Sequence, residues 1–305
     1  MNGTAAMKLD WTPLPGALDL LGECPTWDGA AKTLYWTDIP GKALKSYVPG
    51  TGRHTVWPMP EEVGSFALRA QGGMVLALRS GFALFDPATR ALQPLPSPEY
   101  DRSVMRFNDG RAGPDGRFYA GTMYEPRGRA EGRLFRLDTD LTWAELPDTA
   151  AIISNGLAFT RDARTMYHSD SSSSIINTHA FDPATGNIGP RKTFATIPSP
   201  KEAGGVRLGR PDGAAMDEHD YYWSAMYDGQ RLVRYAPDGR IDREIAFPVR
   251  CPTMICFGGD NLDHLYVTTS RNDRPAHELA TQPDAGKVFV ARVDVRGVPE
   301  PRFDG

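Results

Sequence analysis

A chain of 305 residues with 34 basic and 38 acidic side chains has a formal net charge of −4 and no basic run. This balance excludes the positive surface that nucleic-acid and membrane-surface binding need. No window approaches the roughly 18 apolar residues that span a bilayer, and the N-terminal residues lack the apolar stretch of a signal peptide. We therefore expect a cytoplasmic protein that binds neither nucleic acid nor membranes.

In chain order, residues 1–21 form an extended lead-in, and six similar units follow, starting near residues 24, 65, 109, 155, 212 and 252. Each unit has a short apolar strand, a turn of Gly, Asp or Asn, a strand with aromatic residues, and a third strand. The clearest unit is RPDGAAMDEHDYYWSAMYDGQRLVRYAPDGR at 210–240, with Asp228-Gly229 as a hairpin turn.

A period of about 40–50 residues made only of strands is typical of propeller blades. A sandwich or a barrel is the alternative, but neither repeats a cassette of turn and aromatic strand. We therefore predict an all-β, six-bladed β-propeller with a central channel, formed as a single domain by residues 1–305.

The connections between the predicted strands add further expectations. Blade one begins at Gly22, and the lead-in supplies the outermost strand of the last blade because ring closure removes an exposed edge. Residues 124–131 are a charged insertion in blade three, and residues 271–285 are a polar insertion in blade six. The longest irregular segment, 198–210, contains Gly204-Gly205, so we expect a mobile lid, with a solvated loop without a role as the alternative. No helix with a sustained 3.6-residue period is predicted.

Several residue types that often mark active sites receive structural interpretations here. Cys24, Cys251 and Cys256 are odd in number and lack metal-finger spacing, so they are expected to be buried, reduced thiols. The histidines are scattered and no G-x-S-x-G segment is present, which excludes a Ser-His-Asp hydrolase pattern. We expect His168 to be packed rather than to bind a ligand, and residues 171–174 to form a surface hairpin.

Polar residues recur where the first strand of each predicted blade enters the channel. Four of the six entrances carry a carboxylate or an amide, which together would suit a hard divalent cation. Asx residues before Gly are also common turn formers. The shared position in different blades, and a glutamate that no turn requires, favour the metal site. The six entrances are Glu23, Gly64-Ser65, Asn108-Asp109, Asn155, Asp212 and Thr253.

Five segments in one order cover nearly the whole chain and carry a resemblance to a known family. The chain resembles the family of regucalcin (senescence marker protein), gluconolactonases and bacterial sugar lactonases. This resemblance implies a six-bladed propeller with one divalent metal in the channel, Ca²⁺, Zn²⁺, Mn²⁺ or Mg²⁺. The segments are LGECPTW, RFNDGRAGPDGRFYAGTM, SNGLAFTRDARTMYHSD, RPDGAAMDEHDYYWSA and FGGDNLDHLYVTTS.

The resemblance also implies roles for single residues. The glutamate ligand of the GE-x-P motif falls on Glu23, and the asparagine ligand before a glycine falls on Asn155. The aspartate of the PDG motif falls on Asp212, which is both a metal ligand and the proposed catalytic base.

A second set of positions corresponds to substrate contacts in that family. The Arg-x-Asn pair falls on Arg106 and Asn108, and the glutamate after the GTM segment falls on Glu125, where some members contact sugar hydroxyls. The long segments 124–131 and 198–210 depart from compact relatives, so they bear on which sugar is bound.

These residue types suit the hydrolysis of a lactone, which needs an electrophile on the carbonyl and an activated water. Asp212 would take the proton of the water, and Arg106 would stabilise the developing oxyanion or hold ring oxygens. We predict a metal-dependent hydrolase, monomeric or weakly homo-oligomeric, that opens an aldono-1,4- or 1,5-lactone to the acid. The alternatives are a calcium-binding regulatory protein without turnover and a propeller used only as an interaction scaffold. The shared position of the three metal-ligand candidates counts against the scaffold, which has no use for a metal site.

Overall fold

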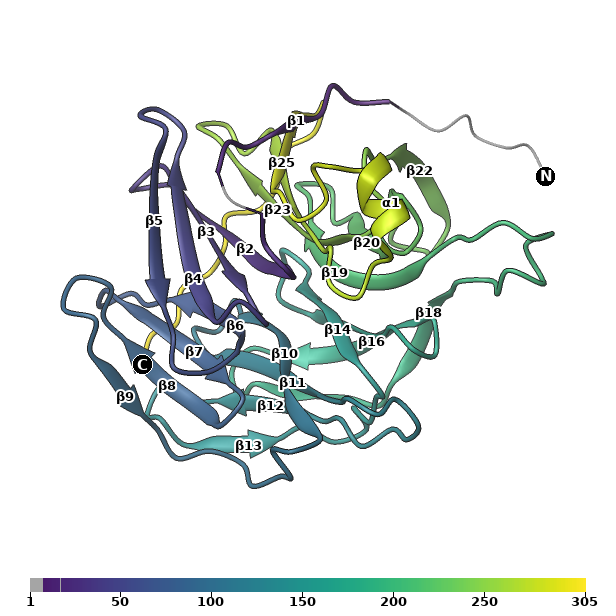
Figure 1. Ribbon diagram of the computed structural model, residues 1–305. Coiled ribbons are helices and arrows are strands. Elements are labelled where there is room, and N and C mark those ends of the chain that lie inside the picture. Colours follow the sequence, from purple (N-terminus) through teal and green to yellow (C-terminus); the bar gives the residue numbers. More distant parts are fainter. Residues whose placement is uncertain (1–7, 17) are drawn as a thin grey trace.

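The computed structural model describes residues 8–16 and 18–305, and it arranges six antiparallel sheets in a ring (Figure 1). Neighbouring innermost strands pack against each other all the way round, from β2 through β23 and back to β2. This architecture is the six-bladed β-propeller that the repeat predicts. The part of the predicted lead-in at residues 1–7 and 17 lies outside the described residues.

Blades one to three each have four strands, which follow one another from the channel outward. Blade one contains β2 (Gly22–Asp28), β3 (Thr33–Asp38), β4 (Ala43–Val48) and β5 (Arg53–Pro58). Blade two contains β6 (Val63–Leu68), β7 (Met74–Leu78), β8 (Gly81–Phe85) and β9 (Leu92–Pro94). Blade three contains β10 (Met105–Ala112), β11 (Phe118–Tyr124), β12 (Leu134–Leu137) and β13 (Trp143–Glu145).

Blades four to six include two departures from this plan, a fifth strand in blade four and a strand from the N-terminus in blade six. Blade four contains β14 (Ser154–Phe159), β15 (Thr165–Asp170), β16 (Ile175–Asp182), β17 (Asn187–Ile188) and β18 (Lys192–Thr196). Blade five contains β19 (Arg210–Met216), β20 (Tyr222–Tyr227), β21 (Arg231–Tyr235) and β22 (Ile241–Ala246). Blade six contains β23 (Pro252–Gly258), β24 (His264–Thr269), β25 (Phe289–Arg292) and β1 (Thr12–Pro13).

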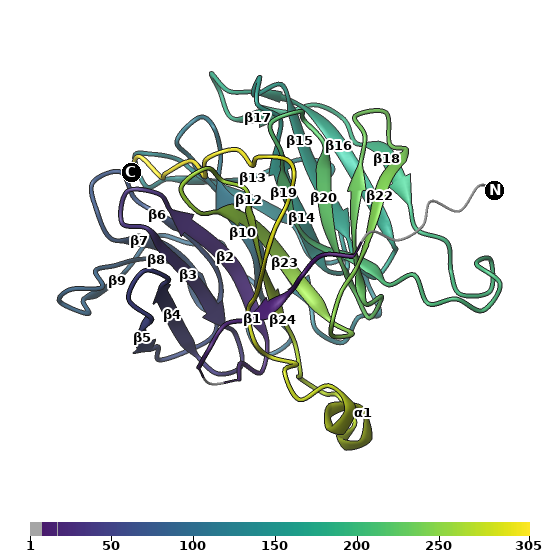
Figure 2. The same ribbon diagram turned by 90° about the horizontal axis from the view of Figure 1, so that it is seen from above.

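The ring closes as the sequence predicts, because β1 pairs antiparallel with β25 as the outermost strand of blade six. The C-terminal residues cross the ring on the side where the innermost strands end, as the yellow segment in Figure 2 shows. Single β-bridges join Gly297 to Asp217 and Phe303 to Arg69, at the far ends of β19 and β6. One mouth of the channel is therefore covered by the chain's own C-terminal segment, and the other mouth remains for a ligand.

The strands are apolar on both faces because each blade is packed between two others. In β7 every residue is buried, and the rings of Tyr167 and Tyr222 stack 4.7 Å apart across blades four and five. The prediction of three strands per unit missed the outer strands, which are short and partly exposed, as in β9 and β13. Edge strands of this kind bury little apolar surface, so their hydrophobic pattern is weak.

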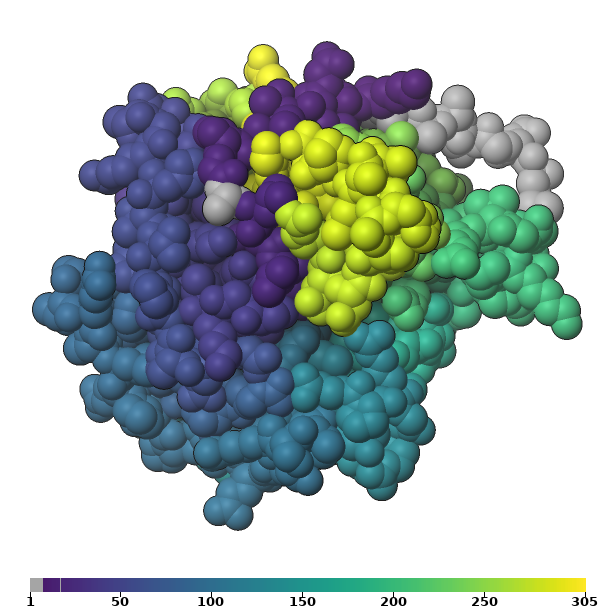
Figure 3. All heavy atoms as spheres, viewed as in Figure 1, coloured from purple at the N-terminus to yellow at the C-terminus, as the bar shows by residue number. Residues whose placement is uncertain are grey.

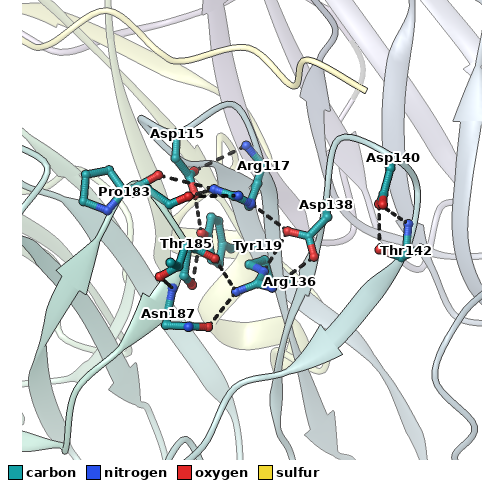
Figure 4. Close-up of polar contacts among 12 residues, drawn as sticks. Asp115, Arg117, Tyr119, Arg136, Asp138, Asp140, Thr142, Pro183, Thr185 and Asn187 are labelled. Atoms are coloured by element: carbon teal, nitrogen blue, oxygen red, sulfur yellow. Dashed lines mark hydrogen bonds and ion pairs between the residues drawn. The ribbon is translucent and has the colours of Figure 1, made fainter.

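Blades three and four are joined by a cluster of ion pairs and hydrogen bonds, which we call the interblade cluster (Figure 4). Arg117 donates to Asp115 at 2.8 Å and to Asp138 at 2.6 Å, and Tyr119 donates its hydroxyl to Asp115 at 2.7 Å. Arg136 reaches across to the β16–β17 connection and donates to Asn187 at 3.0 Å. Every charged group drawn at the centre of this cluster has an opposite charge beside it.

One short helix, α1 (Ala276–Thr281), lies in the insertion of blade six, where no helix was predicted. Six residues make fewer than two turns, so a helical period cannot be recognised there from sequence. Among the described residues, no helix has the length and apolar character to cross a bilayer.

Candidate functional site

A cavity of about 550 Å³ opens at the uncovered mouth of the channel. The structure brings all six predicted site residues to its wall, although they come from four blades. The cavity is also lined by residues that the sequence analysis did not assign to the site, among them Glu62, Ser171 and Arg274. The predicted residues lining it are Glu23, Arg106, Asn108, Glu125, Asn155 and Asp212.

A β-bulge lies at the same level of every innermost strand and positions the cavity residues of these strands, Glu23, Asn108, Asn155 and Asp212. A bulge adds a residue to one strand and thereby re-aims the side chains beside it. The Asn-Gly pair at 155–156 is such a bulge within β14, so its interpretation as a simple turn is wrong. The six register shifts lie between Glu23 and Thr26, Val63 and Ser65, Phe107 and Gly110, Asn155 and Ala158, Pro211 and Ala214, and Pro252 and Ile255.

The backbone at two of these bulges is constrained to the left-handed region. Gly156 has φ +62°, and a Cβ there would lie 2.4 Å from the Tyr222 hydroxyl, so only glycine fits after Asn155. Cys24 also has positive φ, at +52°, which is uncommon for a residue with a side chain. This conformation follows directly on Glu23 and turns the strand where the glutamate enters the cavity.

Glu23 and Asp212 are buried carboxylates that repel each other. Their exposed fractions are 8% and 6%, and burial raises the pKa of each well above its ordinary value. The charge of Asp212 raises the pKa of Glu23 further, and that of Asp109 raises both. In the described part of the chain, neither carboxylate has a lysine or arginine at ion-pair distance. Two buried negative charges without a partner are costly, so this arrangement calls for a cation or a proton.

A chain of hydrogen bonds fixes the amide groups beside these acids. Asn108 donates to the side-chain oxygen of Asn155 at 3.0 Å, and Asn155 donates to the hydroxyl of Ser171 at 2.8 Å. Ser171 in turn donates to the carbonyl of Pro211, 2.6 Å away and next to Asp212. The prediction of a surface hairpin at 171–174 is therefore wrong for Ser171, which is buried. Its position directly after β15, at the channel end, could have been the signal.

Arg106 and Glu125 are held by partners from their own and the neighbouring blade. Arg106 donates to the carbonyl of Phe107 at 2.9 Å and to Asn108 at 2.8 Å. Glu125 accepts two hydrogen bonds from Arg79, at 2.9 and 2.8 Å, and these lower the pKa of its carboxyl group. Arg79 also pairs with Glu62, so blade two contributes a brace that no motif revealed.

His168 and the cysteines behave as structural residues, as predicted. The His168 ring is 2% exposed and bonds the Ser154 hydroxyl at 2.7 Å, outside the cavity wall. Burial lowers the pKa of His168 to about 3, so the ring is neutral. Cys24, Cys251 and Cys256 are all buried with free thiols.

The expected cover of the site lies in a different segment. Of residues 198–210, only Arg210 lines the cavity; the loop after β18 projects from the ring (Figure 1), and Leu208 packs against the core and accepts a hydrogen bond from Arg231 at 3.0 Å. The blade-six insertion contributes Asn272, Asp273 and Arg274 instead, and Figure 3 shows the yellow atoms of this region on the face that carries the cavity. Of the segment expected to form a lid, only Arg210 is therefore placed where it could contact a ligand in the cavity.

A six-bladed propeller with an acid-lined cavity at one channel mouth defines a class of proteins with a ligand site on the ring axis. Within this class, the chain belongs to the SMP-30/Gluconolactonase/LRE-like family, whose model matches residues 21–271. The resemblance noted in the sequence is therefore confirmed.

Relatives of nearly the same length support this assignment. The chain is 42% identical to a 6-deoxy-6-sulfogluconolactonase of Pseudomonas putida, over 94% of this chain and 96% of the relative. It is 34% identical to an L-arabinolactonase of Azospirillum brasilense, over 96% and 95%. Among solved structures, a calcium-binding protein, regucalcin, from Agrobacterium tumefaciens aligns with a TM-score of 0.91 at 26% identity, over 99% and 100% of the two chains.

Proposed function

We propose that this protein is a metal-dependent hydrolase that opens a sugar lactone, of the aldono-1,4- or 1,5-type, to the aldonic acid. The observation that carries the proposal is the pair Glu23 and Asp212, buried in a cavity large enough for a sugar. The names of the lactonase relatives support the substrate class. A single domain over residues 1–305, a cytoplasmic location, and a monomeric or weakly oligomeric state are part of this proposal.

Glu23, Asn155 and Asp212 fit a divalent cation as an oxygen donor set. The described residues contain no group of three or more His, Cys, Asp and Glu side chains that could hold a metal, so the amide of Asn155 has to complete the set. Oxygen donors without sulfur or imidazole favour Ca²⁺, Mg²⁺ or Mn²⁺ over Zn²⁺. Two negative charges match the charge of one such ion. When bound, the ion would polarise the lactone carbonyl and lower the pKa of a water molecule.

The protein groups supply the remaining chemistry. Asp212 would accept a proton from the attacking water as general base. The carbonyl carbon gains the water oxygen, the ring C–O bond breaks, and the proton passes to the departing ring oxygen. Arg106 is already fixed by Phe107 and Asn108, so its remaining N–H groups can donate to the oxyanion without reorganising.

Asn108 and Glu125 orient the sugar in this proposal. The Asn108 amide donates to Ser154 and Asn155 and accepts from Arg106, so its fixed side-chain oxygen can accept one further hydrogen bond from a hydroxyl. Glu125 keeps acceptor capacity beyond its two bonds from Arg79, since a carboxylate has about four lone-pair sites. Correct placement of the reacting atoms contributes strongly to rate, and it depends on such fixed groups.

A calcium-binding regulatory protein without turnover is the second candidate, favoured by the likeness to the regucalcin structure. An ion site alone does not require a cavity of about 550 Å³ or an arginine beside it. The two candidates share the metal and differ in whether a lactone is consumed.

Release of acid from a panel of aldonolactones, measured above spontaneous hydrolysis, tests the proposal. We expect turnover that a chelator abolishes and a divalent ion restores. Glu23→Gln should lose both metal affinity and turnover, whereas Glu131→Gln, an acid outside the cavity, should lose neither. Metal binding without acid release would support the calcium-binding candidate, and turnover that survives complete metal removal would contradict the metal requirement.

A further inference from the structure

Four arginines line the cavity, and they differ in how their charges are balanced. Arg106 lies 3.6 Å from a carboxylate oxygen, and Arg274 lies 2.5 Å from one. Arg127 and Arg210 have no carboxylate at ion-pair distance within residues 8–16 and 18–305. Arg127 is exposed on a turn, whereas Arg210 is half-buried in the first position of β19. Arg210 is therefore a positive charge of the cavity wall without an ion-pair partner, and at longer range its charge lowers the pKa of Asp212.

Arg210 is nevertheless held in place. Its guanidinium lies 5.5 Å from the ring centroid of Tyr227, which is its partner across β19 and β20 and also lines the cavity. A cation–π contact of this kind holds the guanidinium near the ring and leaves its N–H groups available. A fixed fork of N–H donors suits the planar or tetrahedral oxygens of an anion. The geometry is that of a binding group, not of a solvated surface arginine.

The charges around Arg210 leave it positive when the site is loaded. The charges of Glu23 and Asp212 would be balanced by the divalent ion. The other two glutamates of the cavity wall, Glu62 and Glu125, accept hydrogen bonds from Arg79. One acid of the cavity wall, the exposed Asp273, remains to oppose Arg127 and Arg210. With the ion in place, the region of Arg210 therefore attracts negative charge.

The distance along β19 places this charge at the far end of a sugar. Arg210 precedes Asp212 by two residues of extended chain, about 7 Å, and although a bulge begins after Pro211, both side chains line the cavity. If the lactone carbonyl lies beside Asp212, the opposite end of the molecule extends toward the channel mouth, where Arg210 stands.

We propose that Arg210 binds an anionic substituent at the end of the sugar lactone remote from the carbonyl, a sulfonate or a phosphate. The proposal rests on the lactonase function proposed above and defines the substrate class more narrowly. Arg210 is a binding and specificity residue in this scheme and takes no part in bond making.

Comparison of three lactones tests the proposal: glucono-1,5-lactone and its derivatives with a sulfonate or a phosphate at C6. We expect the wild-type kcat/KM for at least one charged lactone to exceed that for the neutral one tenfold or more. Arg210→Gln should lower that ratio about 10- to 100-fold, chiefly through KM, as expected for loss of a charged hydrogen bond of about 1.5–3 kcal/mol. The two charged lactones show whether a sulfonate or a phosphate is preferred. Lys201→Gln, an exposed cation of the preceding segment, is the matched control and should leave the ratio unchanged.

A binding measurement keeps the two proposals separable. Glucose and 6-deoxy-6-sulfoglucose, which cannot be hydrolysed, are titrated calorimetrically into the metal-loaded wild type and the Arg210→Gln variant, and glucose 6-phosphate is titrated alongside. Tighter binding of a charged sugar, lost in the variant, supports the anion site even if no lactone is turned over. Equal affinities for charged and neutral sugars, or equal kcat/KM values in both proteins, would overturn it while leaving the lactonase proposal intact.

Discussion

The interblade cluster and the channel cavity both concentrate charged side chains, but they treat those charges in opposite ways. In the cluster, Asp115 and Asp138 each lie within 2.8 Å of a donor on Arg117 (Figure 4). In the cavity, Glu23 and Asp212 face each other, and no cation in the described residues is at ion-pair distance. The cluster joins two blades, whereas the cavity holds buried negative charge that a bound cation would neutralise.

This difference separates residues that stabilise the fold from residues that act. Paired buried charges hold a geometry, because removing one partner leaves the other uncompensated. Unpaired buried charges destabilise the empty site, and they persist where binding or catalysis uses them. Three predictions test whether the two regions differ in this way.

The largest expected effect is on catalysis at the cavity. Asp212→Asn keeps the shape of the side chain but removes both the base and one negative charge. We expect kcat for lactone hydrolysis to fall by at least 10²–10⁴-fold, the range typical of a lost general base. Steady-state assays at saturating metal measure this loss. Activity within threefold of wild type would exclude Asp212 as the base.

The second effect is on stability at the interblade cluster. Asp115→Ala leaves the Tyr119 hydroxyl and one side of Arg117 without their acceptor, so we expect unfolding to require about 2–4 kcal/mol less. Urea unfolding measures this change, and kcat should stay near the wild-type value because the cluster is remote from the cavity. Asp140→Ala, an exposed acid in the same view, is the control and should change the urea midpoint far less than Asp115→Ala does. A similar loss in both variants would remove the distinction between paired and solvated acids.

The smallest expected effect is a gain in thermal stability rather than a loss. With metal removed, Glu23→Gln should raise the Tm at neutral pH by roughly 2 °C, the shift that about 1 kcal/mol gives in a chain of this size. The raised pKa of Glu23 means that the folded state binds a proton the unfolded state releases. The stability that this proton contributes to the folded state is therefore fully present below the ordinary carboxyl pKa and is lost as the pH rises through the raised pKa of Glu23. The gain of Glu23→Gln should grow with pH in chelator, and with saturating metal the wild type should be the more stable protein. Scanning calorimetry with and without chelator measures both.

Much of this architecture is predictable from the sequence because it is repeated. Six cassettes of similar length predict the blades, and polar residues at one place in each cassette predict which side chains meet. The outer strands were missed, since a strand such as β9 is three residues long and half exposed. Similarity to known relatives gave the roles of Arg106 and Glu125, which spacing alone does not assign.

The bracing contacts could not be predicted, because they join residues far apart in sequence. Arg79 and Glu125 are 46 residues apart, and nothing in either segment specifies the other. The sequence favours 198–210 as the cover of the cavity, because it is the longest irregular segment, contains Gly204-Gly205 and leads directly to Asp212. In the structure, the connection after β24 supplies three cavity-lining residues instead, Asn272, Asp273 and Arg274.

The six bulges at one level of the ring also limit how this fold can diversify. In blade two the position is Gly64, where a Cβ would lie 2.4 Å from the Phe107 carbonyl oxygen, so no larger side chain fits. In blade six, Thr253 donates its hydroxyl to the carbonyl of Gly22 at 2.6 Å and braces the first blade. The other four positions carry a carboxylate or an amide that lines the cavity, namely Glu23, Asn108, Asn155 and Asp212. Evolution of a new specificity in such a ring is expected to proceed through the connecting segments around the mouth, while the number of donors on the axis stays fixed by the backbone.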